Sequence, residues 1–457
     1  MRVDVRVAGD RVVDAGFEAS GCGTMIAAGS ATVALVHGVA LLDAARTGPR
    51  EIAAELGGLS PGKLHAAELA ADALHMALGA AVAEGAALAP RPDAAGAVST
   101  DVDVMPAPVA GRTLVALSGG VDSAVAALLV ARSGREAIAV TLELWRDEAN
   151  DAEASCCSAH AVRLARSVAH RMGLAHFTLD LRAAFAAGVV APFLADHAAG
   201  LTPNPCVRCN GDVRLDAMLA FADRLGAAEL ATGHYARITG DGLLRAAADP
   251  AKDQSYMLAA LAPASLARLR FPLGELHKPQ VRELARAAGL PVADKRESQD
   301  LCFLAGTGKS AFLARHGGLR ERPGTVVDRA GRTVGRHRGQ HLFTIGQRKG
   351  LGIAAAEPLY VLAKDRDANT VTVGARAQLA TTQVALRDAV LHRPAADVDR
   401  VKLRYRTRPL PCRVRARAGG LALELGEPVD GAAPGQLACL MRGDVIVGHG
   451  VIDSPPR

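Results

Sequence analysis

The chain has 457 residues and a mass of 47.1 kDa, and at about 150 residues per domain this length predicts roughly three domains. Half of the residues are hydrophobic and 22% are charged, which excludes a disordered chain, and eight cysteines are too few for a disulfide scaffold. Apolar runs are too short or too diluted by alanine for a membrane span, and the start lacks a signal peptide's apolar core, so we expect a cytoplasmic protein.

The net charge of +6 is distributed unevenly along the chain. Residues 1–110 carry 7 Lys and Arg against 13 Asp and Glu, residues 111–305 carry 21 against 21, and residues 306–457 carry 25 against 13. The last third is therefore the candidate surface for a polyanion. The charge count alone is equally consistent with an arginine-rich surface that contacts only solvent.

The first 88 residues predict a small α+β domain. Short strands open it, and two alanine-rich helices follow at 24–37 and 63–86. Residues 89–110 are rich in Pro, Ala and Gly and lack helical periodicity, which indicates a linker.

After the linker, apolar strands alternate with helices. The order is TLVAL, the loop SGGVDS, a helix, the strand EAIAVTLEL, the helix HAVRLARSVAHRMG and the strand HFTLDL, and LGAAELATGHY repeats the step. This alternation predicts an α/β domain with a parallel sheet covered by helices. Beyond about residue 306, short β-like runs with frequent glycine predict small β domains or a barrel.

The loop SGGVDS, residues 118–123, joins the first strand to its helix. Two glycines permit a close backbone approach, and the helix amino terminus favours phosphate. Asp122 and the two serines are candidates to hold a metal ion or further phosphate oxygens. A plain strand-to-helix turn is the simpler interpretation, but it does not need an acid and two hydroxyls. The string resembles the pyrophosphatase loop of ATP-dependent adenylating enzymes, and it lacks the Walker lysine.

Three cysteines stand out by position. Cys206 and Cys209 lie in TPNPCVRCN, a loop by its prolines, where Arg208 favours thiolate, and Cys302 lies in SQDLCFLA. Structural zinc would require a fourth ligand, which is not apparent. A redox or persulfide pair and an iron–sulfur cluster on the three cysteines both remain open.

From about residue 112 to its end, the chain resembles the tRNA-specific 2-thiouridylases of the MnmA family. The resemblance rests on SGGVDS, TPNPxxxCN, ATGHYAR, KDQSYML, FPLGELHKPQVRELA, SQDLCF, TIGQRKGLGI, KLRYRTRPLPC and PGQLACL. It implies an ATP-pyrophosphatase domain of the adenine nucleotide alpha-hydrolase-like class at 111–305, a small β-rich central domain at 306–376 and a tRNA-binding C-terminal β-barrel at 377–457.

The resemblance also implies an activity. ATP, with Mg, would adenylate the position-2 oxygen of the wobble uridine of tRNA, and sulfur from a persulfide or a cluster would displace AMP. The target base must be unstacked, which costs least in a loop. By resemblance Cys209 is the first catalytic thiol and Cys302 carries the persulfide. Many members have Asp where this chain has Cys206, which favours a [4Fe-4S] cluster on the three cysteines.

Two residue sets carry over from the family. The ATP-binding set is Ala116, Leu117, Ser118, Gly119, Gly120, Val121, Asp122, Ser123, Leu142 and Gly233. The tRNA-binding set is Asn204, Pro205, Cys206, His234, Lys252, Asp253, Gln254, Gln347, Arg404 and Tyr405.

A basic stretch supports the RNA interpretation. In residues 402–417 Lys402, Arg404, Arg406 and Arg408 alternate, as do Arg413, Arg415 and Arg417, with no acid among them. Alternation predicts one charged face on two strands, and we favour a contact with tRNA phosphates over a solvated strand.

The acidic leader resembles the later part of NifU/IscU-type iron–sulfur scaffold proteins, through GFEASGCGTMIAAGSATVALVHG and KLHAAELAADALHMAL. Cys22 matches a ligand of that family, but its His-Cys pair is His65-Ala66 here, so one thiol cannot hold a cluster. Docking of a cysteine desulfurase is the favoured use, a sulfur relay through Cys22 is second, and a relic that only packs is third.

The other four cysteines have simpler interpretations. Cys156 and Cys157 precede a helix and predict packing or capping, and Cys412 and Cys439 predict buried positions in strands. Two other functions explain fewer of these features. A small-molecule amidating ligase explains SGGVDS but not the cysteines or the basic tail, and a cluster carrier leaves the ATP loop unexplained.

Overall fold

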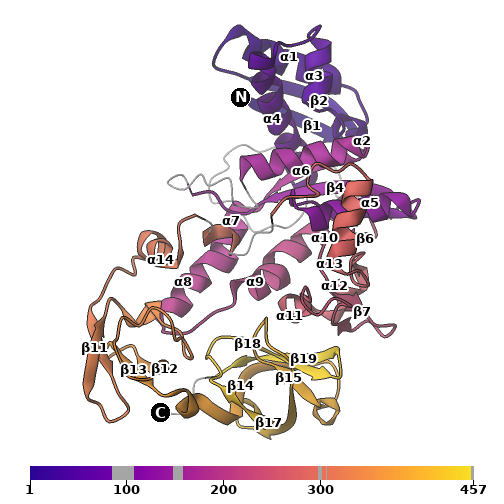
Figure 1. Cartoon of the computed structure of the whole chain (residues 1–457). Helices are drawn as coiled ribbons and strands as arrows, with labels where there is room; N and C mark the ends of the chain where they lie inside the picture. The colour runs from indigo at the N-terminus through magenta and orange to yellow at the C-terminus, as the bar shows by residue number, and fades with distance from the viewer. Residues whose placement is uncertain (85–107, 148–157, 297–300, 305, 454–457) are drawn as a thin grey trace. The chain divides into compact units, whose positions relative to one another are not determined.

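The computed structural model describes residues 1–84, 108–147, 158–296, 301–304 and 306–453 (Figure 1). The chain forms two compact units that are each discontinuous in sequence. The first comprises Met1–Phe185, Arg214–Tyr235 and Ala267–Gly306, and the second comprises Ala186–Val213, Ala236–Leu266 and Thr307–Arg457. Most of the predicted linker, and both Cys156 and Cys157, lie outside the described residues.

The N-terminal part of the first unit is an α+β domain, as predicted. A hairpin of β1 (Arg2–Ala8) and β2 (Arg11–Glu18) is followed by α1 (Gly23–Val36), α2 (Leu41–Ala44), α3 (Pro49–Glu55), a 3-10 turn (Pro61–Lys63) and α4 (Leu64–Ala83). Alanines of α1, α3 and α4 form its core, because small side chains let the helices approach closely. Within the described ranges, the segment Pro61–Ala83 alone is long and apolar enough to cross a membrane, but half of its apolar window is buried inside the protein.

The rest of the first unit is a five-stranded, fully parallel sheet. Its order is β5-β4-β3-β6-β9, made of β3 (Arg112–Ala116), β4 (Glu136–Glu143), β5 (Ala175–Asp180), β6 (Glu229–Ala231) and β9 (Leu269–Arg270). Its main helices are α5 (Val121–Arg132), α6 (Ala159–Arg171), α10 (Leu215–Arg224) and α13 (Lys278–Ala287). The chain moves outward from β3 to β4 and β5 and then crosses back to β6, so the strand order reverses between β3 and β6. Ligands of open α/β sheets bind at the carboxyl ends of the strands at such a point.

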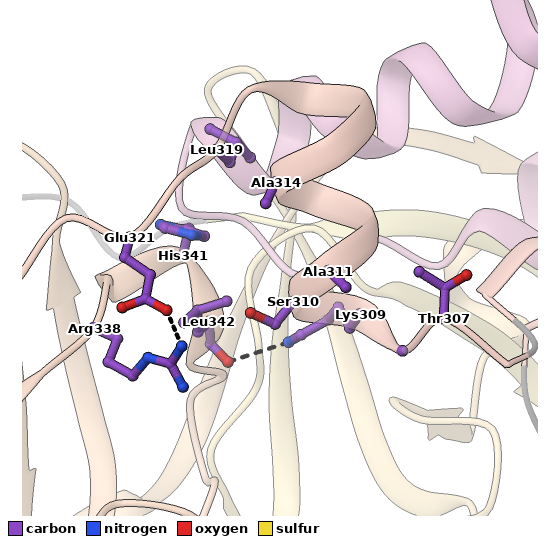
Figure 2. A pocket seen from close by; sticks show the side chains of 11 residues that line it. Thr307, Lys309, Ser310, Ala311, Ala314, Leu319, Glu321, Arg338, His341 and Leu342 are labelled. Atoms are coloured by element: carbon purple, nitrogen blue, oxygen red, sulfur yellow. Dashed lines mark hydrogen bonds and ion pairs between the residues drawn. The ribbon is translucent and has the colours of Figure 1, made fainter. Parts of the chain in front are cut away.

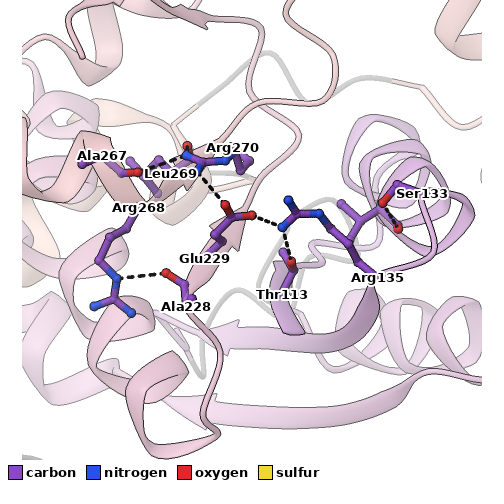
Figure 3. A network of polar contacts seen from close by, with 10 residues as sticks. Thr113, Ser133, Arg135, Ala228, Glu229, Ala267, Arg268, Leu269 and Arg270 are labelled. Carbon is purple, nitrogen blue, oxygen red and sulfur yellow. Dashed lines mark hydrogen bonds and ion pairs between the residues drawn. The ribbon is translucent and has the colours of Figure 1, made fainter. Parts of the chain in front are cut away.

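A polar network ties the amino-terminal edge of this sheet together (Figure 3). Glu229, at the start of β6, pairs with Arg135 just before β4 and accepts a hydrogen bond from Arg270 of β9 at 2.6 Å. Arg135 also donates to the Thr113 hydroxyl of β3 at 3.3 Å. The Glu229 carboxylate thus links β6 to β9 and to the residue before β4, at the edge of the sheet opposite the loop SGGVDS.

Helix α4 of the N-terminal domain packs against β5 of the parallel sheet. Asp72 of α4 accepts hydrogen bonds from Arg163 at 2.7 Å and from Arg166 at 2.6 Å, both in α6. Two turns farther along, Gly79 lies so close to β5 that an added Cβ would stand 2.0 Å from the Thr178 carbonyl oxygen. Only glycine fits at that point.

A group of buried histidines lies in the same contact. The ring of His75 bridges two carbonyl oxygens, with Nδ1 2.6 Å from that of His176 and Nε2 2.9 Å from that of Thr47. His170 and His176 lie beside it, each with its ring centroid 5.2 Å away. Burial, followed by Arg166 and His170, lowers the pKa of His75 to about 3, so the ring is neutral at physiological pH.

The second unit contains a small β-rich part and a closed barrel. The first is α14 (Lys309–Gly317) and a four-stranded sheet of order β11-β10-β13-β12, made of β10 (Gly324–Val327), β11 (Thr333–His337), β12 (Tyr360–Asp365) and β13 (Thr370–Gly374). The barrel comprises β14 (Ala380–Leu391), β15 (Arg400–Lys402), β16 (Leu410–Arg417), β17 (Gly420–Asp430), β18 (Leu437–Arg442) and β19 (Val445–Ile452), and pairing of β14 with β19 closes it.

Two stretches that precede residue 267 also belong to the second unit. They contain the π-helical turn Ala186–Val190, α8 (Ala191–Ala198), α9 (Pro205–Arg208), β7 (Arg237–Ile238), β8 (Leu244–Arg245) and α11 (Ser255–Leu258). Strand β8 pairs with β19, so β7 and β8 extend the C-terminal sheet. This exchange could not be predicted from the sequence, because strands of two residues carry no periodicity.

The prediction of a charged strand over residues 402–408 is wrong. Strand β15 ends at Lys402, and the Thr407 hydroxyl donates to the Arg404 carbonyl at 2.9 Å to close a turn. The alternating residues Arg413, Arg415 and Arg417 do lie exposed on β16.

Acids from outside that stretch offset part of its charge. Glu427 and Glu424 of β17 pair with Arg408 and Arg415. Asp453 pairs with Arg417. The basic face is therefore less positive than residues 402–417 alone suggest.

Candidate active site and RNA-contact residues

The loop SGGVDS lies at the strand-order reversal, as its place after β3 requires. Ala116 ends β3, Leu117 is buried, and α5 begins at Val121. The Ser123 hydroxyl donates to the Gly120 carbonyl at 3.0 Å and accepts from the Ser118 amide at 3.1 Å. These bonds curl the loop around the amino terminus of α5, where backbone N–H groups favour an anion.

Two glycines of the ATP-binding set are required by space. Gly119 has φ +67°, and an added Cβ would stand 2.7 Å from the Ala161 carbonyl oxygen. Gly233, which follows β6, would place a Cβ 2.7 Å from the Ser123 amide nitrogen. The loop after β6 thus lies directly on the first turn of α5, and both sides of the reversal contribute to one site. Leu142 of β4 is buried.

Asp122 is held by two groups that the sequence did not single out. Lys278, the first residue of α13, donates to both carboxylate oxygens at 2.7 and 2.8 Å, and the Tyr235 hydroxyl donates at 2.8 Å. Lys278 is only 8% exposed. Lys295 also reaches the loop and donates to the Gly119 carbonyl at 2.9 Å. The signal for Lys278 was its position in HKPQ, at the start of a helix, where a lysine opposes the helix dipole.

His234 also lies in the first unit, after β6. Its Nδ1 is 2.8 Å from the Thr232 hydroxyl oxygen, and its ring meets Phe271 edge-on. Burial, followed by Arg214, lowers its pKa to about 3. A neutral imidazole is therefore available beside the loop SGGVDS as a hydrogen-bonding group rather than as a cation.

The cysteine loop is built by an asparagine cap in the second unit. The Asn204 side chain accepts from the Cys206 amide at 3.2 Å and starts α9, and Pro205 takes the first helical position. Cys209 is 6% exposed at the start of the π-helical turn Cys209–Arg214, whereas Cys206 is partly exposed. The two thiols thus differ in access although they are three residues apart.

The loop meets the KDQSYML segment, which contains three of the residues predicted to contact RNA. Asn210 donates to the Met257 carbonyl at 3.2 Å, and Asn204 lies 3.7 Å from the Met257 sulfur. Asp253 accepts from Lys402 at 2.9 Å, and these two side chains are 8% and 10% exposed. Lys402 is thus a buried partner of Asp253 rather than an exposed phosphate contact.

The remaining predicted RNA contacts also belong to the second unit. Arg404 donates to the carbonyls of Ile345 and Gly431, both at 3.2 Å, and the ring of Tyr405 lies 6.3 Å from that of Tyr256. Gln347 is held by its own turn, in which its Oε1 accepts from the Thr344 amide at 3.0 Å. Lys252 and Gln254 flank Asp253 just before α11.

Cys302 belongs to the first unit and Cys206 and Cys209 to the second. It begins the 3-10 turn Cys302–Leu304, anchored by Phe303 against Phe185 with ring centroids 5.8 Å apart. In the part of the chain that the structure describes, no group of three His, Cys, Asp or Glu side chains is arranged to hold a metal ion. The three cysteines of the expected [4Fe-4S] cluster thus belong to different units, and the cluster stays a prediction.

Cys22 occupies the N-cap position of α1, where its side chain makes no capping hydrogen bond, and is exposed. A backbone hydrogen bond from Met25 lowers its pKa below that of an ordinary thiol. His65 Nδ1 lies 3.0 Å from the Gly62 carbonyl oxygen. A thiol and one imidazole do not fit a cluster, since a cluster takes more ligands than two.

Cys412 and Cys439 are buried in β16 and β18, as predicted. Burial raises the pKa of both thiols, that of Cys412 to about 11. They are inert packing residues.

Comparison with known proteins gives four family models that follow one another along the chain. They are "NifU-like N terminal domain" at residues 1–83, "tRNA methyl transferase HUP domain" at 111–306, "tRNA methyl transferase PRC-barrel domain" at 310–375 and "Aminomethyltransferase beta-barrel domain" at 361–452. Together with the sheet topology, they confirm the predicted fold class.

The relatives cover most or all of the chain. "Bifunctional protein NifU/MnmA" of Rubrobacter xylanophilus is 42% identical over 99% of this chain and 91% of its own length. Two proteins named "tRNA-specific 2-thiouridylase MnmA" match about three quarters of the chain. That of Geobacter metallireducens is 41% identical over 75% of this chain and 97% of its own, and that of Xanthobacter autotrophicus is 44% identical over 74% and 90%.

Proposed function

Because the chain belongs to the MnmA family of tRNA-specific 2-thiouridylases, in the form that carries a NifU-like N-terminal domain, we propose that it replaces the position-2 oxygen of the wobble uridine of tRNA by sulfur at the expense of ATP. The observation that carries the proposal is the phosphate loop at the strand-order reversal, with Gly233 packed on the first turn of α5. A loop of that shape suits ATP, and the cysteines supply the sulfur chemistry.

Activation of the base is the first proposed step. A pyrimidine carbonyl oxygen is a poor leaving group, so the position-2 oxygen attacks the α-phosphorus of ATP and pyrophosphate leaves. The loop amides at Gly119 and Gly120 and the dipole of α5 hold phosphate oxygens there. The carboxylate of Asp122 suits Mg²⁺, which would neutralise phosphate charge when it arrives with the nucleotide. Lys278 then adds a second positive charge at the same place.

Sulfur delivery is the second proposed step. The outer sulfur of a persulfide on Cys302 attacks carbon 2 of the uridine, and the bond to the adenylated oxygen breaks to release AMP. Cys209 then attacks the sulfur of Cys302, which forms a disulfide between the two cysteines and leaves the sulfur on the base. The two thiols supply the two electrons that reduce persulfide sulfur, and an external thiol restores them.

The cysteine desulfurase or another sulfur donor is the proposed protein partner, docked by the N-terminal domain. The exposed Cys22, with its lowered pKa, supports the relay as a second use. Packing alone is the third.

Mass spectrometry of tRNA tests the proposal. Unmodified tRNA is incubated anaerobically with the protein, ATP, cysteine and a cysteine desulfurase, and nucleosides are then analysed. We expect 2-thiouridine at the wobble position in step with pyrophosphate release. Absence of 2-thiouridine from this complete mixture contradicts the function.

Cysteine variants assign the steps. Cys209→Ser and Cys302→Ser should each remove 2-thiouridine, while pyrophosphate release persists in Cys302→Ser because adenylation precedes sulfur attack. Cys412→Ala, a buried cysteine outside the site, is the matched control and should remain active. Cys22→Ser separates relay from docking, since an unchanged rate with desulfurase present excludes the relay. Iron analysis of anaerobically purified protein tests the cluster route, and iron-free but active enzyme excludes it as a requirement.

A further inference from the structure

Two lysines of the central β-rich part bring their ammonium groups to neighbouring backbone carbonyls. Lys309, the first residue of α14, donates to the Leu342 carbonyl at 3.2 Å. Lys364 of β12 donates to the Phe343 carbonyl at 2.9 Å. Both side chains are half-buried, and among the residues described neither forms an ion pair with a carboxylate. Half-buried cations without a counter-charge are costly, which makes the pair a candidate anion site.

The electrostatics of the surroundings point the same way. Burial lowers the pKa of Lys309, and burial together with Lys309 lowers that of Lys364 to about 8. Burial and the same two lysines lower the pKa of His341, and they lower that of His197 to about 3. The imidazoles are therefore neutral, and the positive charge resides on the lysines. An anion beside them would stabilise the charged ammonium groups.

A cavity of about 490 Å³ adjoins Lys309 (Figure 2). Thr307, Ser310 and the rest of the first turn of α14 line it. Gly308, at the N-cap, provides no side-chain cap, so the amides of that turn are not satisfied by a capping group. Hydroxyls, amides and an ammonium group are the donors that phosphate oxygens accept.

Arg338 completes the wall and pairs there with Glu321, which among the described residues is the one carboxylate lining the cavity (Figure 2). The two side chains are 72% and 50% exposed. An ion pair this exposed contributes little, so a phosphate group can compete for the guanidinium.

We propose that this cavity binds a phosphate group of the tRNA backbone, held by Lys309 and Arg338 of its wall, with the nearby charge of Lys364 adding to the attraction. The inference rests on the proposed function, because tRNA is the polyanion that the enzyme must hold. The source favoured is RNA rather than free phosphate, since residues 306–457 carry 25 Lys and Arg against 13 Asp and Glu.

Binding of tRNA to variants of the full chain tests the site. The variants are Lys309→Met, Lys364→Met and the double substitution. Arg329→Met, in the exposed turn between β10 and β11, is the control that removes one positive charge elsewhere in the same part. Filter binding at about 50 to 200 mM salt gives the affinity and its salt dependence. We expect the double variant to bind about tenfold more weakly, with a log–log salt slope shallower by about one, and the control to stay close to the unmodified protein.

A second readout does not depend on RNA. The double variant should melt at or above the temperature of the unmodified protein, because it loses half-buried cations that lack a counter-charge, and a fall of several degrees contradicts this account. Inorganic phosphate should raise the melting temperature of the unmodified protein and not that of the double variant.

The outcomes separate the site from the function. The site is overturned if the double variant has the same tRNA affinity and salt slope as the unmodified protein and phosphate does not raise the melting temperature of either. The proposed 2-thiouridine formation is unaffected by that result. If the double variant is no longer stabilised by inorganic phosphate but binds tRNA as tightly as the unmodified protein, the cavity binds free phosphate and the RNA source is overturned. If the unmodified protein binds no tRNA, the proposed function fails, and the phosphate arm still decides whether the cavity binds an anion.

Discussion

Replacement of Asp72 by Asn tests how firmly helix α4 is held on the parallel sheet. Asp72 is bonded to Arg163 and Arg166, and the Arg166 side chain is only 3% exposed, while that of Asp72 is 26% exposed. Loss of the carboxylate leaves the Arg166 guanidinium buried without a charged partner. Breaking a fully buried pair costs about 3–5 kcal/mol, and the partial exposure of Asp72 reduces the expected loss to about 2–3 kcal/mol.

Urea unfolding followed by fluorescence measures that loss. The chain has one tryptophan, Trp145, which belongs to the same compact unit as Asp72. At a slope of about 2 kcal/mol per molar urea, the midpoint should fall by roughly 1 M. Asp43→Asn is the matched control, because Asp43 pairs with Arg46 at 2.6 Å but the two side chains are 64% and 42% exposed. It should shift the midpoint by no more than about 0.5 M.

A double-mutant cycle isolates the pair. Adding Arg166→Met to Asp72→Asn removes the stranded charge, so the double variant should recover part of the stability lost by Asp72→Asn. If Asp72→Asn and Asp43→Asn shift the midpoint equally, the α4 contact does not depend on this carboxylate and the reasoning is refuted.

Three further predictions follow from buried groups. The pKa of His75 is lowered to about 3 by burial, so the unfolded chain binds a proton near pH 6.5 that the folded ring does not. The free energy of unfolding should therefore be highest above about pH 6.5 and decline below it. Melting curves at about pH 7.5 and 5 check this, and the His75→Gln variant should show a smaller change in melting temperature between the two pH values. Lys278→Met removes positive charge beside Asp122 and should slow tRNA-dependent pyrophosphate release by about 100-fold, as a pyrophosphate assay measures. Lys402→Met strands the 8%-exposed Asp253, and should cost about 3 kcal/mol in urea unfolding while it raises the Kd for tRNA more than the KM for ATP.

The region around the loop SGGVDS was largely predictable from the sequence. The strand TLVAL, the two glycines and the following helix define a local unit whose geometry depends on a few adjacent residues, and β3, the loop and α5 match it. The contact of Lys278 with Asp122 was not predicted, because the two residues are 156 positions apart and no periodicity encodes such a contact. Gly233 was recognised by resemblance, whereas its physical reason, the absence of space for a Cβ, required coordinates.

The basic stretch shows why alternation is weaker evidence. Charges at every second position predict one face only where the backbone stays extended, and the turn at Arg404 breaks that premise after Lys402. Burial of Lys402 then depends on Asp253, a residue of another segment. Helix α14 was also missed, because a nine-residue helix in a glycine-rich β region has little pattern of its own.

The α4 contact limits how the role of the N-terminal domain can be tested. Asp72, His75 and Gly79 each meet a matching group on α6 or β5, so this face is adapted to its partner surface. Deletion of residues 1–84 would uncover Arg166 and buried backbone of β5, and would lower activity whether the domain docks a donor, relays sulfur or only packs. Substitutions on α1 avoid that ambiguity, because Cys22 is exposed and its helix packs on other elements of its own domain. Exposed positions of α1, rather than truncation, therefore discriminate among the three uses.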